Sequence, residues 1–156
     1  MGDLPGQKIS LMTRADLVKA FLERLCAEIG VDAENVYNPK TGAWYFSQGS
    51  STLEVFLTVQ KNLKQEPQTF LRCMAALCEI PKDLMQQYKL YKTSLAINGA
   101  YLGYKISADE SRGIVCVIAE RNIDGMDYDE MITLIRDLGL WAEKLDKFLQ
   151  QEFVAR

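Results

Sequence analysis

Residues 95–153 read LAINGAYLGYKISADESRGIVCVIAERNIDGMDYDEMITLIRDLGLWAEKLDKFLQQEF, which predicts a helix end, a two-stranded hairpin and a long amphipathic helix in unbroken order. The pair Asn98-Gly99 is typical of a helix C-terminus. The hairpin strands are expected over 101–106 and 114–120, on either side of a polar turn. This order indicates a fold but not an activity.

The last helix is predicted to begin after Asp127, which has Glu130 three residues later, as in a capping box. Apolar residues then recur at helical spacing from Met131 to Leu149 and form one stripe. Gly139 interrupts this stripe at a cost of about 1 kcal/mol relative to Ala. We therefore expect another element to pack closely against it.

The upstream sequence predicts a helix, three strands and a second helix. Thr13 and Asp16 have capping-box spacing, and the helix 14–29 that follows is expected to end at Gly30. The strands are expected at 44–46, 53–59 and 69–78, and the second helix at 84–95. The fold class is therefore α+β in the order α-β-β-β-α-β-β-α, with an antiparallel sheet packed against helices.

The composition indicates one ordinary globular domain. The chain has 156 residues, 48% of them hydrophobic, and a net charge of -3. We expect a loose leader over residues 1–12 and a single domain over 13–156. Because no dense basic patch and no apolar run of about 18 residues is present, we expect neither nucleic acid nor membrane as a partner, and a cytoplasmic location.

The absence of His excludes imidazole relays and His-bearing metal sites. The four cysteines contain no C-x-x-C pair, and Cys73 and Cys78 are expected on opposite faces of one strand, too far apart for a disulfide. We interpret the cysteines as reduced core residues. A reactive thiol near Cys73 or Cys116 is the alternative.

Asp124, Asp127, Asp129 and Glu130 form an acidic cluster that could suggest a cation site. A calcium loop distributes its ligands over about 12 residues around a central Gly, and this cluster is shorter. Helix capping is the interpretation we favour. The sequence therefore predicts no catalytic residue, no cofactor and no metal.

The second face of the predicted sheet is the candidate binding site. Leu53, Val55, Leu57 and Val59 alternate with other residues and are expected to face the helices. The opposite face is then predicted to carry Tyr45, Glu54, Phe56, Phe70, Arg72, Met74 and Tyr101. An apolar patch bordered by charges is typical of a partner surface, although a helix of the same chain could equally cover it.

The order of elements and their junctions carry a family resemblance. Together with the hairpin 44–59, the Asn98-Gly99 junction and the strand-to-helix run 114–130 resemble the YbjN-like domain and the wider fold of type III secretion chaperones. The resemblance covers residues 13–153 and looks closest to cyanobacterial and plastid members of unknown function. It implies a small α+β protein that is often a dimer, binds other proteins and has no catalytic site.

The leading functional hypothesis is a non-enzymatic, chaperone-like module that binds a segment of an unidentified partner protein on the second sheet face. A homodimer is expected from the resemblance, and Tyr88 and Tyr91 of the second helix suit a subunit contact. The alternative is a small-molecule sensor or a thiol-dependent enzyme with a pocket near Cys73 or Cys116.

Overall fold

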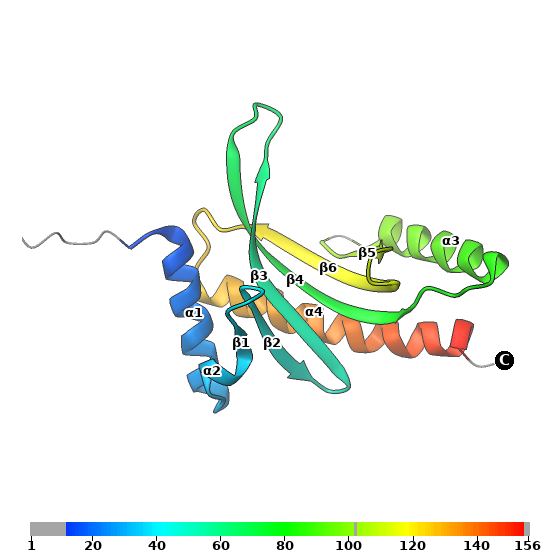
Figure 1. Ribbon diagram of the computed structural model, residues 1–156, viewed down its shortest axis with the longest axis horizontal. Coiled ribbons are helices and arrows are strands. Elements are labelled where there is room, and N and C mark those ends of the chain that lie inside the picture. Colours follow the sequence, from blue (N-terminus) through cyan, green and yellow to red (C-terminus); the bar gives the residue numbers. More distant parts are fainter. Residues whose placement is uncertain (1–11, 102, 155–156) are drawn as a thin grey trace, which may run out of the picture.

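One six-stranded antiparallel sheet, in the order β1-β2-β3-β4-β6-β5, organises the molecule (Figure 1). A computed structural model describes residues 12–101 and 103–154, so the predicted leader falls almost entirely outside the described residues. The strands are β1 Tyr37–Asn38, β2 Ala43–Gln48, β3 Ser51–Lys61, β4 Pro67–Glu79, β5 Lys105–Asp109 and β6 Ile114–Asn122. The helices are α1 Arg14–Ile29, α2 Ala33–Val36, α3 Leu84–Ala100 and α4 Tyr128–Leu149, followed by the π-helical turn Gln150–Val154.

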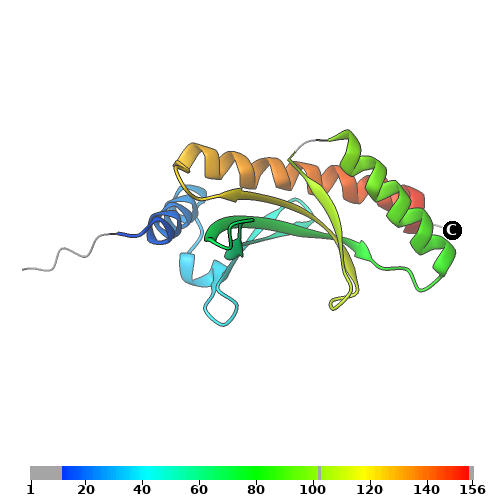
Figure 2. The same ribbon diagram turned by 90° about the horizontal axis from the view of Figure 1, so that it is seen from above.

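The predicted α+β class and the order of the main elements are confirmed. Two small elements, α2 and β1, were not predicted, because neither is long enough to show a periodic pattern. Figures 1 and 2 show α4 running along one side of the sheet, with α1 near its N-terminal end and α3 near its C-terminal end. The β3–β4 hairpin extends beyond the other strands (Figure 1).

The ends of α1 and the start of α4 follow the predicted local signals. The Thr13 hydroxyl accepts a hydrogen bond from the Asp16 N–H at 3.1 Å, and the Asp16 carboxylate accepts from Thr13 in return. Asp127 and Glu130 form the same reciprocal box at α4. Each box satisfies amide groups that the helix itself leaves unpaired, which fixes the first helical turn.

The main core lies between the helices and one face of the sheet. Leu53 and Val55 of β3 are fully buried there with Leu22 of α1 and Leu138 of α4. Gly139 is buried on α4, and a Cβ placed on it would come within 1.9 Å of the Gln48 side-chain oxygen. The expected close packing at this glycine is confirmed.

The end of the second helix was predicted wrongly. α3 continues through Asn98 and Gly99 to Ala100, and β5 begins at Lys105 rather than at Tyr101. Asn98 does not cap the helix because its side chain hydrogen-bonds both the N–H and the C=O of Ile106 on β5. A tertiary contact therefore replaces the local cap that the Asn-Gly pair indicated.

The third predicted strand is confirmed as β4, despite the helix propensity of Met74 to Leu77. A register shift between Ala76 and Cys78 alters its last residues. The expectation that Cys73 and Cys78 lie on opposite faces is wrong, because this bulge turns Cys78 back toward the core that contains Cys73. No helix in the described ranges is long and apolar enough to cross a membrane.

Candidate functional site

The helices leave one face of the sheet uncovered. Figure 2 shows α4 lying along one side of the strands, and buried residues of α1, α3 and α4 belong to the single main core with one face of the sheet. We call the other side the open face and define it by the side chains Glu54, Phe56, Arg72, Met74, Cys116, Ile118 and Glu120, which share one face of β3, β4 and β6. A hollow of about 530 Å³ lies over it and is bordered by the β5–β6 turn.

The floor of the open face is apolar. Met74, Cys116 and Ile118 form a small cluster separate from the main core, and the half-buried Phe56 packs against it. Met74 and Ile118 are each 8% exposed. The Cys116 Sγ donates a 3.5 Å hydrogen bond to the Ser107 carbonyl. All four members of this cluster come from strands.

An ionic group centred on Glu120 covers one side of the floor. The Arg72 guanidinium lies 2.8 Å from the Glu120 carboxylate, and Lys105 of β5 contacts the same carboxylate. Partial burial by itself would raise the pKa of Glu120, but the hydrogen bonds from Lys105 and Arg72 outweigh it and lower the pKa. Glu120 therefore stays ionised and holds two cations beside the floor at neutral pH.

A second polar group centred on Glu54 borders the opposite side. Arg112, from the turn between β5 and β6, lies 3.2 Å from the Glu54 carboxylate, and the Tyr45 hydroxyl donates to the same carboxylate at 3.4 Å. The contact between Arg112 and Glu54 joins residues 58 positions apart in the sequence. The open face thus has an apolar floor between two charged clusters.

The structure brings together most of the predicted site residues. Tyr45, Glu54, Phe56, Arg72 and Met74 lie on the open face in register on β2, β3 and β4. Only the floor of this face is apolar, because the polar side chains of these same strands lie beside it and carry ion pairs. Its role as a partner surface stays a prediction.

Two predicted residues lie elsewhere. Phe70 shares the strand face of Arg72 but pairs with Asn122 at the end of β6, away from the hollow. Tyr101 is not part of a strand: it follows α3, and its ring packs edge-to-face on Trp141 of α4 with 4.7 Å between ring centres. The predicted start of the strand at Tyr101 is therefore wrong.

The β5–β6 hairpin adds side chains to the open face that sequence reasoning did not place there: Lys105, Arg112, Cys116, Ile118 and Glu120. Cys116, Ile118 and Glu120 alternate along β6, and this period of two was a usable signal. The position of Arg112 opposite Glu54 had no comparable signal, because it depends on the order of strands in the sheet.

Burial makes all four thiols poor nucleophiles. Burial raises the pKa of the Cys73 thiol to about 12. Burial also raises the pKa values of Cys26, Cys78 and Cys116. A raised pKa keeps a thiol protonated and therefore poorly nucleophilic at neutral pH. All four cysteines are free, which agrees with their interpretation as reduced core residues.

The acidic cluster before α4 acts in capping and in an ion pair. Asp127 caps the helix, and the Glu130 carboxylate accepts from the Asp127 N–H and from Arg121. Within residues 12–101 and 103–154, no group of three or more Asp, Glu or Cys side chains is placed to hold a metal ion.

Comparison with solved structures identifies the fold. The ExsC-ExsE complex matches with a TM-score of 0.62 and 14% identity, over 89% of this chain and 95% of that chain. The Yersinia pestis type III secretion chaperone SycH, in complex with a stable fragment of YscM2, gives a TM-score of 0.50 and 13% identity over 85% of this chain and 99% of that one. YbjN from E. coli matches with a TM-score of 0.57 and 10% identity, over 90% of this chain and 96% of that chain.

These similarities confirm the predicted YbjN-like and type III secretion chaperone-like fold. They show the fold alone, because the sequence identities are low. No family model matches the sequence, and no curated protein matches it. The expected closeness to cyanobacterial and plastid members stays a prediction.

Proposed function

We propose that this chain is a non-enzymatic, chaperone-like module that binds a segment of another protein on its open face. The observation that carries the proposal is a sheet face without a covering helix in the described residues, with an apolar floor between two charged clusters. Apolar surface bordered by polar groups is typical of protein interfaces.

The fold neighbours support a role in protein binding. Two of the solved structures that contain a chain of this fold are protein complexes, one of ExsC with ExsE and one of SycH with a stable fragment of YscM2. Applied to this chain, that likeness favours binding over catalysis. The raised pKa values of the thiols point the same way, since they disfavour the thiol-dependent enzyme that was the alternative.

The chemistry of the open face defines the segment that it fits. Phe56 offers the accessible part of an aromatic ring, and Met74, which is 8% exposed, packs behind it with a flexible thioether that adapts to side chains of different shapes. The charged clusters contain both signs, with Arg72 and Lys105 at one side and Glu54 and Arg112 at the other. We infer that the partner segment presents apolar side chains toward the floor and charged side chains of both signs toward its borders.

A single substitution tests this proposal. Phe56→Glu places a carboxylate on the floor, directly opposite Arg72 in the sheet register, so the fold can accommodate the new charge as a cross-strand pair. We expect a partner captured from native lysate by the unmodified chain to bind this variant about 10-fold or more weakly, as for loss of an interface aromatic.

The matched control is Leu140→Glu, which adds the same charge at an exposed site on α4, away from the sheet. This control should retain full partner affinity in titration calorimetry. Equal affinity of all three proteins, with circular dichroism showing that each is folded, would remove the basis of the proposed docking site.

We also propose that the chain forms a homodimer through α3. This helix exposes Leu84, Met85 and Tyr88, each with at least 60% of its surface accessible, although it belongs to a folded domain. Such apolar side chains on one helix favour contact with a second copy. Sedimentation equilibrium should give twice the chain mass, and Tyr88→Glu should give the single-chain mass; an unmodified chain that stays monomeric would refute the proposal.

The cytoplasm is the proposed location, because four unpaired thiols are compatible with a reducing compartment. Nucleic acid is not proposed as a partner, since the net charge is -3 and the cations of the open face are already paired with carboxylates. Cell fractionation with an antibody to the chain tests the location directly, and recovery in an oxidising compartment would contradict it.

A further inference from the structure

A cavity between α3 and β5 lies on the helix side of the sheet, apart from the open face. Its volume is about 170 Å³, and its walls are mainly the apolar parts of Tyr91, Leu95, Ile106, Ala108 and Val115. An engineered apolar cavity of about 150 Å³ is large enough to hold benzene. The cavity between α3 and β5 therefore has room for one small ring.

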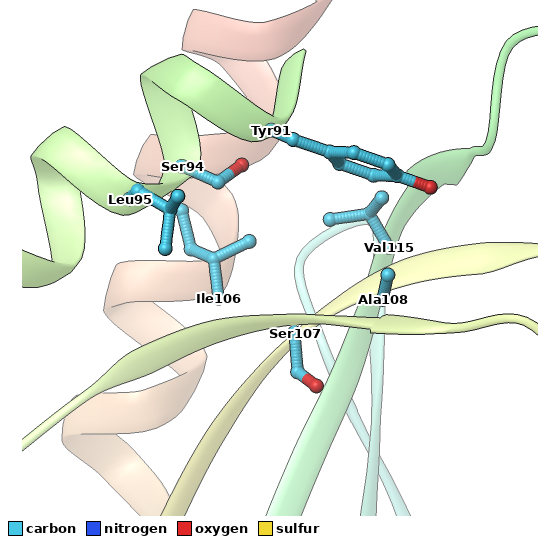
Figure 3. A pocket seen from close by; sticks show the side chains of 7 residues that line it. All are labelled: Tyr91, Ser94, Leu95, Ile106, Ser107, Ala108 and Val115. Carbon is cyan, nitrogen blue, oxygen red and sulfur yellow. The ribbon is translucent and has the colours of Figure 1, made fainter. Parts of the chain in front are cut away.

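One polar atom faces this apolar space without a partner. Ser94 of α3 is 7% exposed, and its Oγ is the only buried side-chain oxygen or nitrogen in the described residues that lacks a hydrogen bond. Figure 3 shows this hydroxyl directed from the helix toward the space between Tyr91 and Ile106. Because a buried hydroxyl without a partner is unfavourable, a molecule that supplies one gains affinity there.

Tyr91 and Leu95 control the entrance. The Tyr91 ring lies across the cavity above Val115 (Figure 3), and its hydroxyl donates to the exposed Glu110 carboxylate at 3.2 Å. Leu95 is 71% exposed and forms the outer wall. Water can replace an exposed hydrogen bond at little cost, so the Tyr91 ring can turn aside. An entering molecule can then reach the buried Ser94 hydroxyl.

We propose that this cavity binds a small, mainly apolar molecule that carries one hydrogen-bonding group, of the size of a phenol, with that group paired to the Ser94 hydroxyl. The apolar walls provide affinity, and the single hydroxyl provides orientation and selectivity. The cavity and the hollow over the open face share only Ser107 and Ala108 of the edge strand β5, and Ser94 lines the cavity alone. Partner binding and phenol binding can therefore fail separately in Ser94→Ala.

Phenol and benzene are the probes for this site, because they differ only in the hydroxyl group. In an NMR titration of the full chain, both should shift the methyl signals of Ile106 and Val115, and phenol should bind more tightly. Ser94→Ala should weaken phenol about 5-fold, the loss of one hydrogen bond, and leave benzene unchanged. A merely structural role for Ser94 would not separate the two probes.

Ala108→Phe fills the cavity from the exposed edge strand and should abolish binding of both probes. Ala76→Phe adds the same ring at an exposed position on the other sheet face and should leave both affinities unchanged. Shifts confined to other residues, or an unchanged phenol affinity in Ser94→Ala, would overturn the proposal. So would loss of phenol binding as protein concentration rises, which would assign the cavity to a contact with a second copy.

Discussion

Asn98 joins α3 to the edge strand β5, and its replacement should show how that edge is held. The side-chain amide donates to the Ile106 carbonyl at 3.0 Å, and its oxygen accepts from the Ile106 N–H at 2.6 Å. Asn98 therefore pairs with β5 as a neighbouring strand would. Asn98→Ala removes both hydrogen bonds and leaves a half-buried backbone pair unsatisfied, so we expect a loss of about 2–3 kcal/mol in the free energy of unfolding.

Asn98→Asp tests the donated hydrogen bond more specifically, because it keeps the shape and the acceptor of the side chain but replaces the amide donor with a second carboxylate oxygen. At pH 7 that oxygen faces the Ile106 carbonyl, and we expect a loss of about 2 kcal/mol. Only the protonated carboxyl can donate, so its pKa is raised in the folded variant. The hydrogen bond from the protonated carboxyl therefore stabilises the folded variant at low pH, and this stabilisation is lost as the pH rises through the raised pKa.

Urea unfolding at pH 7 and near pH 3.5 measures this difference between variant and unmodified chain at each pH. Amide exchange at Ile106 reports the same contact locally. Asn35→Asp, on the exposed surface of α2, is the matched control and should change stability by less than about 0.5 kcal/mol. A variant Asn98→Asp that is as stable as the unmodified chain at pH 7, or equally impaired at both pH values, would refute the reasoning.

Three further predictions follow from local contacts. Tyr128→Phe removes a 2.6 Å hydrogen bond to Glu28 and should lower the free energy of unfolding in urea by about 1 kcal/mol. Burial and Glu28 raise the pKa of Tyr128 to about 12, so the stability that this hydrogen bond contributes should be lost as the pH rises through that value. Thiol labelling at pH 7.5 should be slow throughout, with the half-buried Cys78 reacting faster than Cys73, and one rapidly labelled cysteine would revive a thiol activity. Gly49→Ala should cost about 1 kcal/mol in thermal unfolding, since its φ is +57°, and a neutral result would contradict this.

The helix starts could be predicted from the sequence because their signals are local. Thr13 with Asp16, and Asp127 with Glu130, contain both partners of each capping box within four residues. The end of α3 could not be predicted in this way. Asn98 has the sequence context of a cap, yet its side chain is used by a strand eight residues later.

The open face could be predicted only in part, because alternation along a strand is a local signal and ion pairs between strands are not. Alternation along β3 and β4 placed Glu54, Phe56, Arg72 and Met74 on one side of the sheet. The charged clusters that border the floor depend on long-range pairs, since Glu54 meets a residue 58 positions away and Arg72 one 48 positions away. Only the strand order, which places β6 between β4 and β5, brings these residues together.

Site-specific photo-crosslinking tests the docking role of the open face most directly. A benzophenone amino acid in place of Phe56 lies on the floor of that face, whereas the same group in place of Leu140 lies on the exposed side of α4. After irradiation in native lysate, mass spectrometry should find one recurrent segment of another protein attached at position 56 and absent at position 140. Attachment of the same proteins at both positions, or of none at position 56, would contradict a docking role for the open face.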